Sequence, residues 1–259
     1  MDLLFALILI FALQIFFFIF AAILRTDKVT DLAYGLSFVI VALWAAFTVN
    51  DAFTWIIALA ITFWGLRLAS FLLIRVIRLR SDKRFDGIRE SFLRFGMFWF
   101  FQASIVFVIL LPFLFVSQNG VLLRNLATLD VFGWMLFIIG LSVWLIGFVI
   151  EAVADWQKYQ FKNKNPKKWT DVGLWKYARH PNYFGEMLCW WGLFVAMIPV
   201  LQGWQIIGAI SPLAITGILL FGSGIPTVEK QHQKHYGKNK EYQQYRKRTN
   251  VLVPLPKRK

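Results

Sequence analysis

The segment "LLFALILIFALQIFFFIFAAIL", residues 3–24, decides the fold, because it is apolar at every position except Gln14. At about 1.5 Å per residue, a helix of this length crosses the roughly 30 Å hydrocarbon core of a bilayer. The run is too long for the core of a signal peptide, and its first positive charge, Arg25, follows it. It therefore predicts a transmembrane helix.

Six more apolar segments follow, at residues 32–49, 53–74, 95–116, 130–150, 184–201 and 204–225. The chain has 259 residues, of which 58% are hydrophobic and only 16% charged, which is too apolar for a soluble protein of this length. We expect an all-α integral membrane protein with seven transmembrane helices. We also expect one membrane domain, 1–259, with helices 1–4 in 1–127 and helices 5–7 and a tail in 128–259. No internal repeat is visible, which disfavours a transporter built on repeats.

Loops rich in lysine and arginine alternate along the chain with loops that have one such residue or none. The first, third and fifth loops and the tail are basic, the second and sixth loops carry no Lys or Arg, and the fourth carries only Arg124. Because cytoplasmic loops collect Lys and Arg, this pattern predicts an outside N-terminus and a cytoplasmic C-terminus. The same bias accounts for the net charge of +14 without a nucleic-acid partner. The single cysteine, Cys189, excludes a disulfide within the monomer and does not suggest a cysteine-based metal site.

The most informative motif is "RHPNYFGEMLCWWG", residues 179–192. Pro181 suits the first turn of a helix, and a helix start preceded by Arg179 and His180 suits a phosphate. Asn182 and Glu186 are four residues apart and share one face. A carboxylate facing lipid at this depth would cost roughly 2.5–3.5 kcal/mol, so Glu186 needs a reason to be there. The alternative is an interfacial cap with Glu186 paired to a neighbouring helix.

Glu151, Asp155, Lys158 and Lys162 are spaced by four, three and four residues and form one helical stripe. The two carboxylates followed by two lysines would match a ribose followed by a phosphate. The alternative is an amphipathic surface helix with ion pairs within the helix.

The third helix carries Arg67, Arg75 and Arg78 on one face with Trp64. Arg75 and Arg78 are also placed to snorkel to the interface, whereas the deeper Arg67 is a functional candidate. At the start of the second helix, Asp31 is either a helix N-terminal charge or a buried acid facing a pocket, with Tyr34 beside it.

The tail contains two histidines near a carboxylate. Glu229 and His232 are about one helical turn apart, and His235 and Tyr236 follow on the next turn. The spacing matches no recognised metal-binding pattern, so we expect no metal. A solvated basic tail is the alternative.

"RHPNYFGE", two further apolar helices and a tail containing "YRKRTNVLVP" together resemble the membrane steroid 5α-reductase superfamily, and most of all its bacterial branch. Isoprenylcysteine carboxyl methyltransferases and sterol C14-type reductases share this C-terminal pattern. The resemblance implies seven helices around an NADPH pocket open to the cytoplasm, in a bacterial inner membrane, and a lipophilic substrate such as a steroid.

The resemblance also carries over to single residues. Asn182 and Glu186 match the family's Asn and Glu, and Lys162 stands where the family has a phosphate-binding Arg. The candidate cofactor-binding residues are Arg67, Arg75, Arg78, Glu151, Asp155, Lys162, Trp169, Arg179, His180, Asn182, Tyr183, Glu186, Glu229, His232 and His235. The candidate catalytic residues are Asp31, Tyr34 and Trp64. The chain departs from the vertebrate steroid enzymes, which carry a Gln-Glu pair near the position of Asp31 and a Tyr near that of Trp64.

The hypothesis is an NADPH-dependent reductase of the C=C bond of a lipophilic enone, with Asp31 or Tyr34 stabilising the charge that develops on the carbonyl oxygen. Glu186 would accept from the nicotinamide carboxamide. One alternative is an isoprenylcysteine-type carboxyl methyltransferase that uses S-adenosylmethionine. That cofactor carries no phosphate and leaves the arginines of the third helix and Lys162 without a role. Another is a non-catalytic lipid-binding or channel-like protein, which leaves Asn182 and Glu186 unexplained.

The orientation is testable by chemical labelling. Cysteine introduced near Asn119 should react with a membrane-impermeant maleimide in intact cells, and cysteine near Lys83 or Lys164 should not. The parent chain, with Cys189 alone, is the control. The opposite labelling would overturn the orientation.

Overall fold

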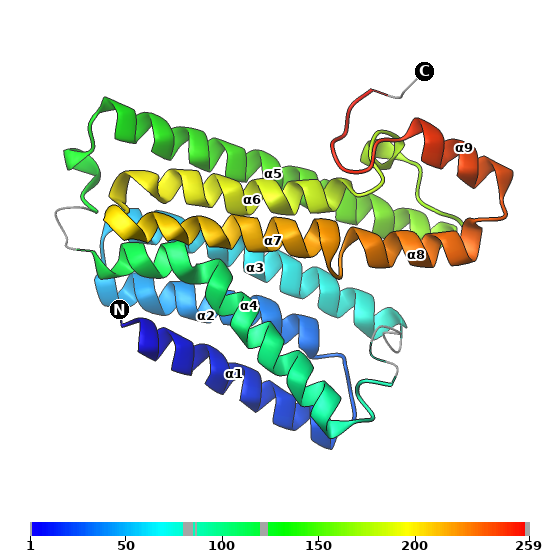
Figure 1. Cartoon of the computed structure of the whole chain (residues 1–259), viewed down its shortest axis with the longest axis horizontal. Helices are drawn as coiled ribbons and strands as arrows, with labels where there is room; N and C mark the ends of the chain where they lie inside the picture. Colours follow the sequence, from blue (N-terminus) through cyan, green and yellow to red (C-terminus); the bar gives the residue numbers. More distant parts are fainter. Residues whose placement is uncertain (1, 80–84, 86, 120–123, 257–259) are drawn as a thin grey trace. The chain divides into compact units, whose positions relative to one another are not determined.

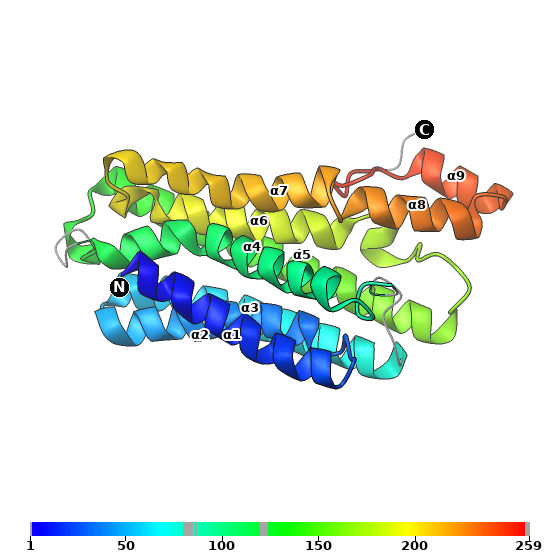
Figure 2. The same ribbon diagram turned by 60° about the horizontal axis from the view of Figure 1, so that its bottom comes forward.

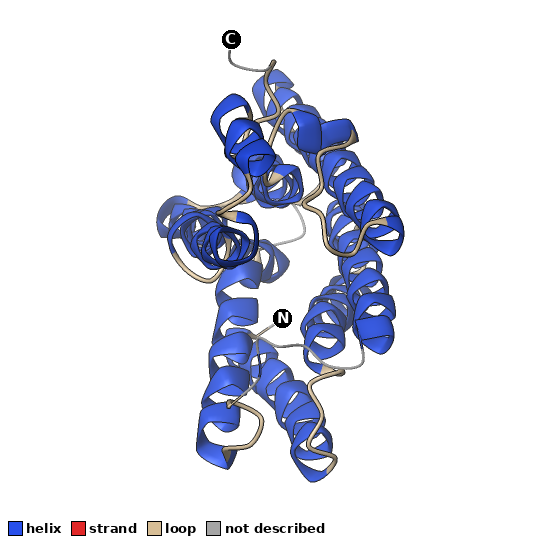
Figure 3. Cartoon of the chain, turned by 90° about the vertical axis from the view of Figure 1, so that its right-hand side faces the viewer, coloured by secondary structure: helices blue, strands red, loops and turns tan. Residues whose placement is uncertain are grey.

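The computed structural model describes residues 2–79, 85, 87–119 and 124–256, with the side chains of residues 78 and 79 excepted (Figure 1). Its elements are helical (Figure 3). In the described residues, β-pairing is limited to one isolated bridge between Ala178 and Asn250.

The long helices are α1 (Leu3–Ile23), α2 (Thr30–Val49), α3 (Ala52–Leu79), α4 (Phe92–Gln118), α5 (Val131–Lys164), α6 (Pro181–Met197), α7 (Ile210–Phe221), α8 (Ile225–Tyr236) and α9 (Lys240–Arg248). Short 3-10 helices are η2 (Leu126–Thr128), η3 (Gly173–Lys176), η4 (Ile198–Val200) and η5 (Gly203–Ala209). By length and composition, the described residues hold seven segments able to cross a membrane, which confirms the predicted number.

Helix α5 continues past its apolar part to Lys164, as the helical spacing of the polar stripe from Glu151 predicts. The boundaries of the last apolar segment differ from the sequence-based prediction. The segment predicted at 204–225 divides into η5 and α7, and α8 follows after a break at Gly222–Gly224. A Cβ at Gly224 would collide with the backbone of Leu219, so this turn requires glycine.

The chain forms two compact units. Unit 1 comprises the residues up to 135 together with 197–211, and unit 2 comprises 136–196 and 212–259. The predicted single domain, and its division after residue 127, stay predictions.

In unit 1, hydrogen bonds satisfy Gln14, the polar residue that interrupts the first apolar segment. Gln14 of α1 is only 2% exposed; its amide donates to Ser37 Oγ of α2 at 2.9 Å and accepts from Gln102 Nε2 of α4 at 2.9 Å. Gln102 also donates to the carbonyl oxygen of Thr30 at 3.1 Å. Since hydrocarbon offers polar groups no partner, this network holds α1, α2 and α4 in one arrangement.

Ion pairs lie at both ends of α2 in unit 1. Arg124, the one basic residue of the fourth loop, is buried and contacts Asp51 just beyond α2 at 2.7 Å. This ion pair explains why a basic residue occurs in a loop that the charge pattern assigns to the outside. At the opposite end, Arg89 contacts the buried Asp27 at 2.9 Å.

Helices α5 and α6 of unit 2 run side by side with their backbones in contact (Figures 1 and 2). A Cβ at Gly147 of α5 would lie 2.6 Å from the carbonyl oxygen of Gly185 of α6. A Cβ at Gly185 would lie 2.6 Å from the backbone nitrogen of Glu151. A second pair, Gly140 and Gly192, repeats the contact seven residues away on each helix. Small residues of this kind let membrane helices approach closely.

Replacing Gly185 by Leu should destabilise unit 2, because its side chain would meet backbone atoms that cannot move aside. Overpacking costs about 1–3 kcal/mol or more, so the melting temperature of the purified protein should fall by several degrees. Gly217→Leu on α7 is the control, since no described atom lies within 4 Å of a Cβ placed there. Equal melting temperatures for the two variants would contradict close packing of α5 on α6.

Candidate functional site

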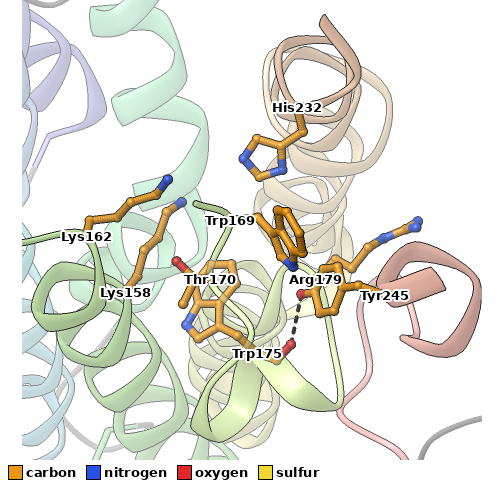
Figure 4. Close-up of a pocket in the computed structure, with 8 residues that line it drawn as sticks. All are labelled: Lys158, Lys162, Trp169, Thr170, Trp175, Arg179, His232 and Tyr245. Atoms are coloured by element: carbon orange, nitrogen blue, oxygen red, sulfur yellow. Dashed lines mark hydrogen bonds between the residues drawn. The ribbon is translucent and has the colours of Figure 1, made fainter. Parts of the chain in front are cut away.

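Unit 2 contains a small basic pocket (Figure 4). Its lining residues are Lys158, Lys162, Trp169, Thr170, Trp175, Arg179, His232 and Tyr245. They include three cations and no carboxylate. They come from α5, from the connection between α5 and α6, from α8 and from α9 (Figure 4). A concentration of positive charge of this kind favours an anion.

The two lysines reach the pocket because α5 stays helical through residues 151–164, which confirms the helical stripe predicted from their spacing. Lys162 Nζ donates to Tyr236 Oη at 3.0 Å and to the carbonyl oxygen of Lys168. Lys158 Nζ lies 4.8 Å from the centre of the Trp175 ring. Aromatic and carbonyl contacts therefore hold both ammonium groups beside the pocket.

Aromatic side chains form the wall between α5 and the C-terminal helices. The Trp169 ring lies 5.3 Å from Tyr242 and 5.8 Å from Tyr236, between ring centroids. Tyr245 Oη donates to the carbonyl oxygen of Trp175 at 2.8 Å (Figure 4). This packing fixes α9 against the connection that carries Trp169 and Trp175.

Trp169 Nε1 and Thr170 Oγ1 in the pocket lining are buried without a hydrogen-bond partner among the described residues, as is Arg179 Nε, which however lies 3.3 Å from Glu229 Oε1 in an ion pair. Trp169 and Thr170 are 9% and 4% exposed. Trp99 and Trp144 also leave an indole N–H unpartnered, but neither lines this pocket. A buried unpaired donor is costly, and here a phosphate oxygen would satisfy it. The charges and donors of the lining residues thus suit an anionic oxygen, such as that of a phosphate.

The side chains of Arg179 and His180 meet on Glu229 of α8. Glu229 Oε1 lies 3.3 Å from Arg179 Nε and 2.9 Å from His180 Nε2, and Oε2 lies 3.3 Å from Arg246 Nε. Burial lowers the pKa of His180, against the opposing effect of Glu229, so the imidazole is neutral near pH 7 and donates from Nε2. The His180 ring also stacks on Tyr183, with centroids 5.6 Å apart.

The remaining sequence-predicted residues of unit 2 lie on α5, α6 and α8. Glu151 and Asp155 are buried, and the backbone of Glu151 adjoins Gly185, so Glu151 is level with the turn that carries Asn182 and Glu186. His235 is exposed, and its Nδ1 contacts the carbonyl oxygen of Gln231 on its own helix. His232 lines the pocket instead, as do Lys162, Trp169 and Arg179.

The residues predicted in unit 1 form separate contacts. Asp31 Oδ2 lies 3.5 Å from Arg75 Nη2. The rings of Tyr34 and Trp64 each pack on Phe38, with centroids 5.1 and 5.3 Å apart. Arg67 is half-buried on α3; Arg78 lies on the same helix, and its side chain is outside the described part of the chain. Catalytic or cofactor-binding roles for these residues stay predictions.

Thr170, Trp175 and Tyr245 line the pocket but were not predicted. Tyr245 lies in the "YRKRT" segment that supported the family resemblance, so a signal for it was present. Thr170 and Trp175 lie in an irregular connection with no periodicity, and nothing local marks them.

The fold and pocket define an all-helical multi-pass membrane protein with a basic pocket beside its polar C-terminal helices. The chain belongs to the family described as "Protein of unknown function (DUF1295)", which matches residues 17–249.

The chain is also distantly related to steroid 5α-reductases. It is 28% identical over 162 residues to 3-oxo-5-alpha-steroid 4-dehydrogenase 1 of Rattus norvegicus. The aligned region covers 60% of this chain and 57% of the relative. The chain is 29% identical over 158 residues to the Bos taurus protein of that name, covering 58% of this chain and 56% of the relative. The chain thus spans less than two-thirds of the length of these relatives. No solved structure matches it significantly.

The lowered pKa of His180 predicts a pH-dependent stability. The pKa of an unfolded histidine is about 6.5. Below that pH the unfolded chain therefore binds a proton that folded His180 does not, and the free energy of unfolding decreases as the pH is lowered. His180→Gln keeps an N–H donor but does not titrate. Its melting temperature should therefore fall less than the parent's between about pH 7 and pH 5.5. His235→Gln, at an exposed position, should keep the parental slope; a parental slope in His180→Gln would contradict the assignment.

Proposed function

We propose that the chain is an NADPH-dependent reductase that reduces the C=C bond of a lipophilic enone. The observation that carries this proposal is the pocket that gathers Lys158, Lys162 and Arg179 around the unpartnered donors of Trp169 and Thr170. The distant relation to the 3-oxo-5-alpha-steroid 4-dehydrogenases supports a redox enzyme with a lipophilic substrate.

In this proposal the three cations and the two donors hold phosphate groups of the cofactor. The phosphates of NADPH supply many charged acceptor oxygens, whereas S-adenosylmethionine has no phosphate and a single carboxylate, so three cations and two donors in one pocket favour the nucleotide over the methyl donor. Asn182 and Glu186, on the first turns of α6, orient the nicotinamide amide. The cofactor supplies the hydride that reaches the β-carbon of the enone.

The substrate side of the proposal rests on unit 1. Helices α1 to α4 provide apolar, aromatic surfaces suited to a lipid-soluble molecule. The Tyr34 hydroxyl is our proposed donor to the substrate carbonyl, where it would stabilise the negative charge that develops as the β-carbon is reduced. Asp31 contacts the guanidinium of Arg75 and serves as an acceptor, so we assign the donor role to Tyr34 rather than to Asp31. A solvent proton then completes the saturated product at the α-carbon.

The basic loops and tail support a cytoplasmic position for the lysine-rich end of α5 and for α8 and α9. We therefore propose that the nucleotide enters from the cytoplasm, where NADPH is available, in a bacterial inner membrane.

Lys162→Gln should weaken NADPH binding, because it removes a charged donor from the phosphate pocket. Charge-assisted hydrogen bonds contribute about 1.5–3 kcal/mol, so the dissociation constant should rise roughly tenfold to a hundredfold. Titration of purified protein, followed by the fluorescence of the reduced nicotinamide, measures it. Lys164→Gln, two residues further along α5 and exposed, is the matched control.

The reaction itself is tested by adding lipophilic enones, including a 3-oxo-Δ4-steroid, to the protein with NADPH. Loss of nicotinamide absorbance together with a saturated product supports the reductase. Binding of S-adenosylmethionine without binding of NADPH would overturn the proposal in favour of a methyltransferase. Binding of neither would favour a non-catalytic protein.

A further inference from the structure

The motif that precedes α6 contacts the C-terminal part of unit 2 through both its side chains and its backbone. The Arg179 and His180 side chains converge on Glu229 of α8, which Arg246 of α9 also contacts. The Arg179 N–H donates to the carbonyl oxygen of Asn250 at 2.9 Å, and the His180 N–H donates to that of Val251 at 3.1 Å. We call α8, α9 and residues 249–253 the C-terminal cap.

One half-buried carboxylate therefore joins three separate segments. Glu229 receives Arg179 and His180 from the connection before α6, and Arg246 from α9. A largely buried charge is tolerated only when it is paired, and removing it leaves the opposing cations without a partner. The backbone bonds to residues 250 and 251 lie beside these contacts, so the cap and the start of α6 are fastened together at one place.

This fastening involves residues that line the basic pocket. Arg179 lines the pocket, but Glu229 holds its Nε and the carbonyl oxygen of Arg246 accepts from its Nη1 at 3.1 Å. His232 and Tyr245, which also line the pocket, belong to the cap. Glu229 itself does not line it. Its contacts thus set the positions of three lining residues from outside the pocket.

We propose that Glu229 is a positioning residue: it fastens the C-terminal cap to the start of α6 and fixes Arg179 in the anion pocket, without touching the bound nucleotide. This differs from the cofactor-binding role predicted for Glu229 from the sequence. The part that concerns nucleotide affinity rests on the proposed function, whereas the fastening of the cap does not.

Glu229→Gln tests the proposal, with Glu241→Gln, an exposed carboxylate of α9, as the matched control. Hydrogen exchange should become faster in peptides containing residues 177–181 and 249–253, and should stay parental in α1 to α4. Affinity for NADPH and for inorganic pyrophosphate should fall about tenfold. In an Arg179→Gln background, Glu229→Gln should weaken binding no further, because both changes act through one guanidinium.

Arg246→Gln keeps Glu229 and removes one of its contacts, so it provides a milder variant if Glu229→Gln does not fold. It should accelerate exchange in the same two peptides to a smaller extent. Parental exchange in both variants would overturn the fastening. Additive losses of affinity in the double variant would overturn the positioning role and place Glu229 on the nucleotide. A parent protein that binds neither NADPH nor pyrophosphate would overturn the proposed function, and the exchange result would still decide whether Glu229 fastens the cap.

Discussion

Contact between the backbones of α5 and α6 is the constraint on which the rest of unit 2 depends. Gly147 and Gly185 let the two helices approach so closely that neither position has room for a side chain. Helix α5 then carries Lys158 and Lys162 beyond its apolar part, and the connection leading into α6 carries Trp169, Thr170 and Arg179. The glycine contacts therefore fix the two helices between which the connection that carries these lining residues runs, although no glycine lines the pocket.

The polar network of unit 1 and the pocket of unit 2 use buried polar groups differently. In unit 1, Gln14, Gln102 and Ser37 satisfy one another, as expected where hydrocarbon offers no partner. Such a network specifies how helices pack but offers nothing to a ligand. In unit 2, Trp169 and Thr170 keep buried donors without a partner among the described residues, in a pocket lined by three cations. This contrast identifies the pocket, rather than the polar network, as the place where a bound anion would add stability.

Much of the fold follows from local sequence, because the length and apolar character of a membrane helix are properties of one segment. Hydropathy predicted seven helices, and the stripe from Glu151 to Lys162 predicted the polar end of α5. The break before α8 was missed, because apolar residues continue up to the turn at Gly222–Gly224. The pairing of residues 179–180 with residues 250–251 was also missed, since periodicity contains no information about contacts between segments seventy residues apart. The cofactor-binding roles predicted for the side chains of the motif stay predictions, and the contact of Arg179 and His180 with Glu229 was not apparent from the sequence.

The shared contact of Arg179 and His180 with Glu229 bears on what the motif can indicate about the reaction. If His180 serves chiefly to hold the C-terminal cap, and Arg179 supplies one cation that suits any anion, the motif alone does not determine which cofactor the pocket accepts. The choice of cofactor would then depend also on the other groups proposed to meet it, namely Lys158, Lys162 and the donors of Trp169 and Thr170. These residues lie outside "RHPNYFGE", in the end of α5 and the connection after it. A sequence that keeps the motif but lacks the two lysines would keep the cap and lose the preference for phosphate. On the proposed function, therefore, the end of α5 indicates more about the cofactor of this chain than the motif does.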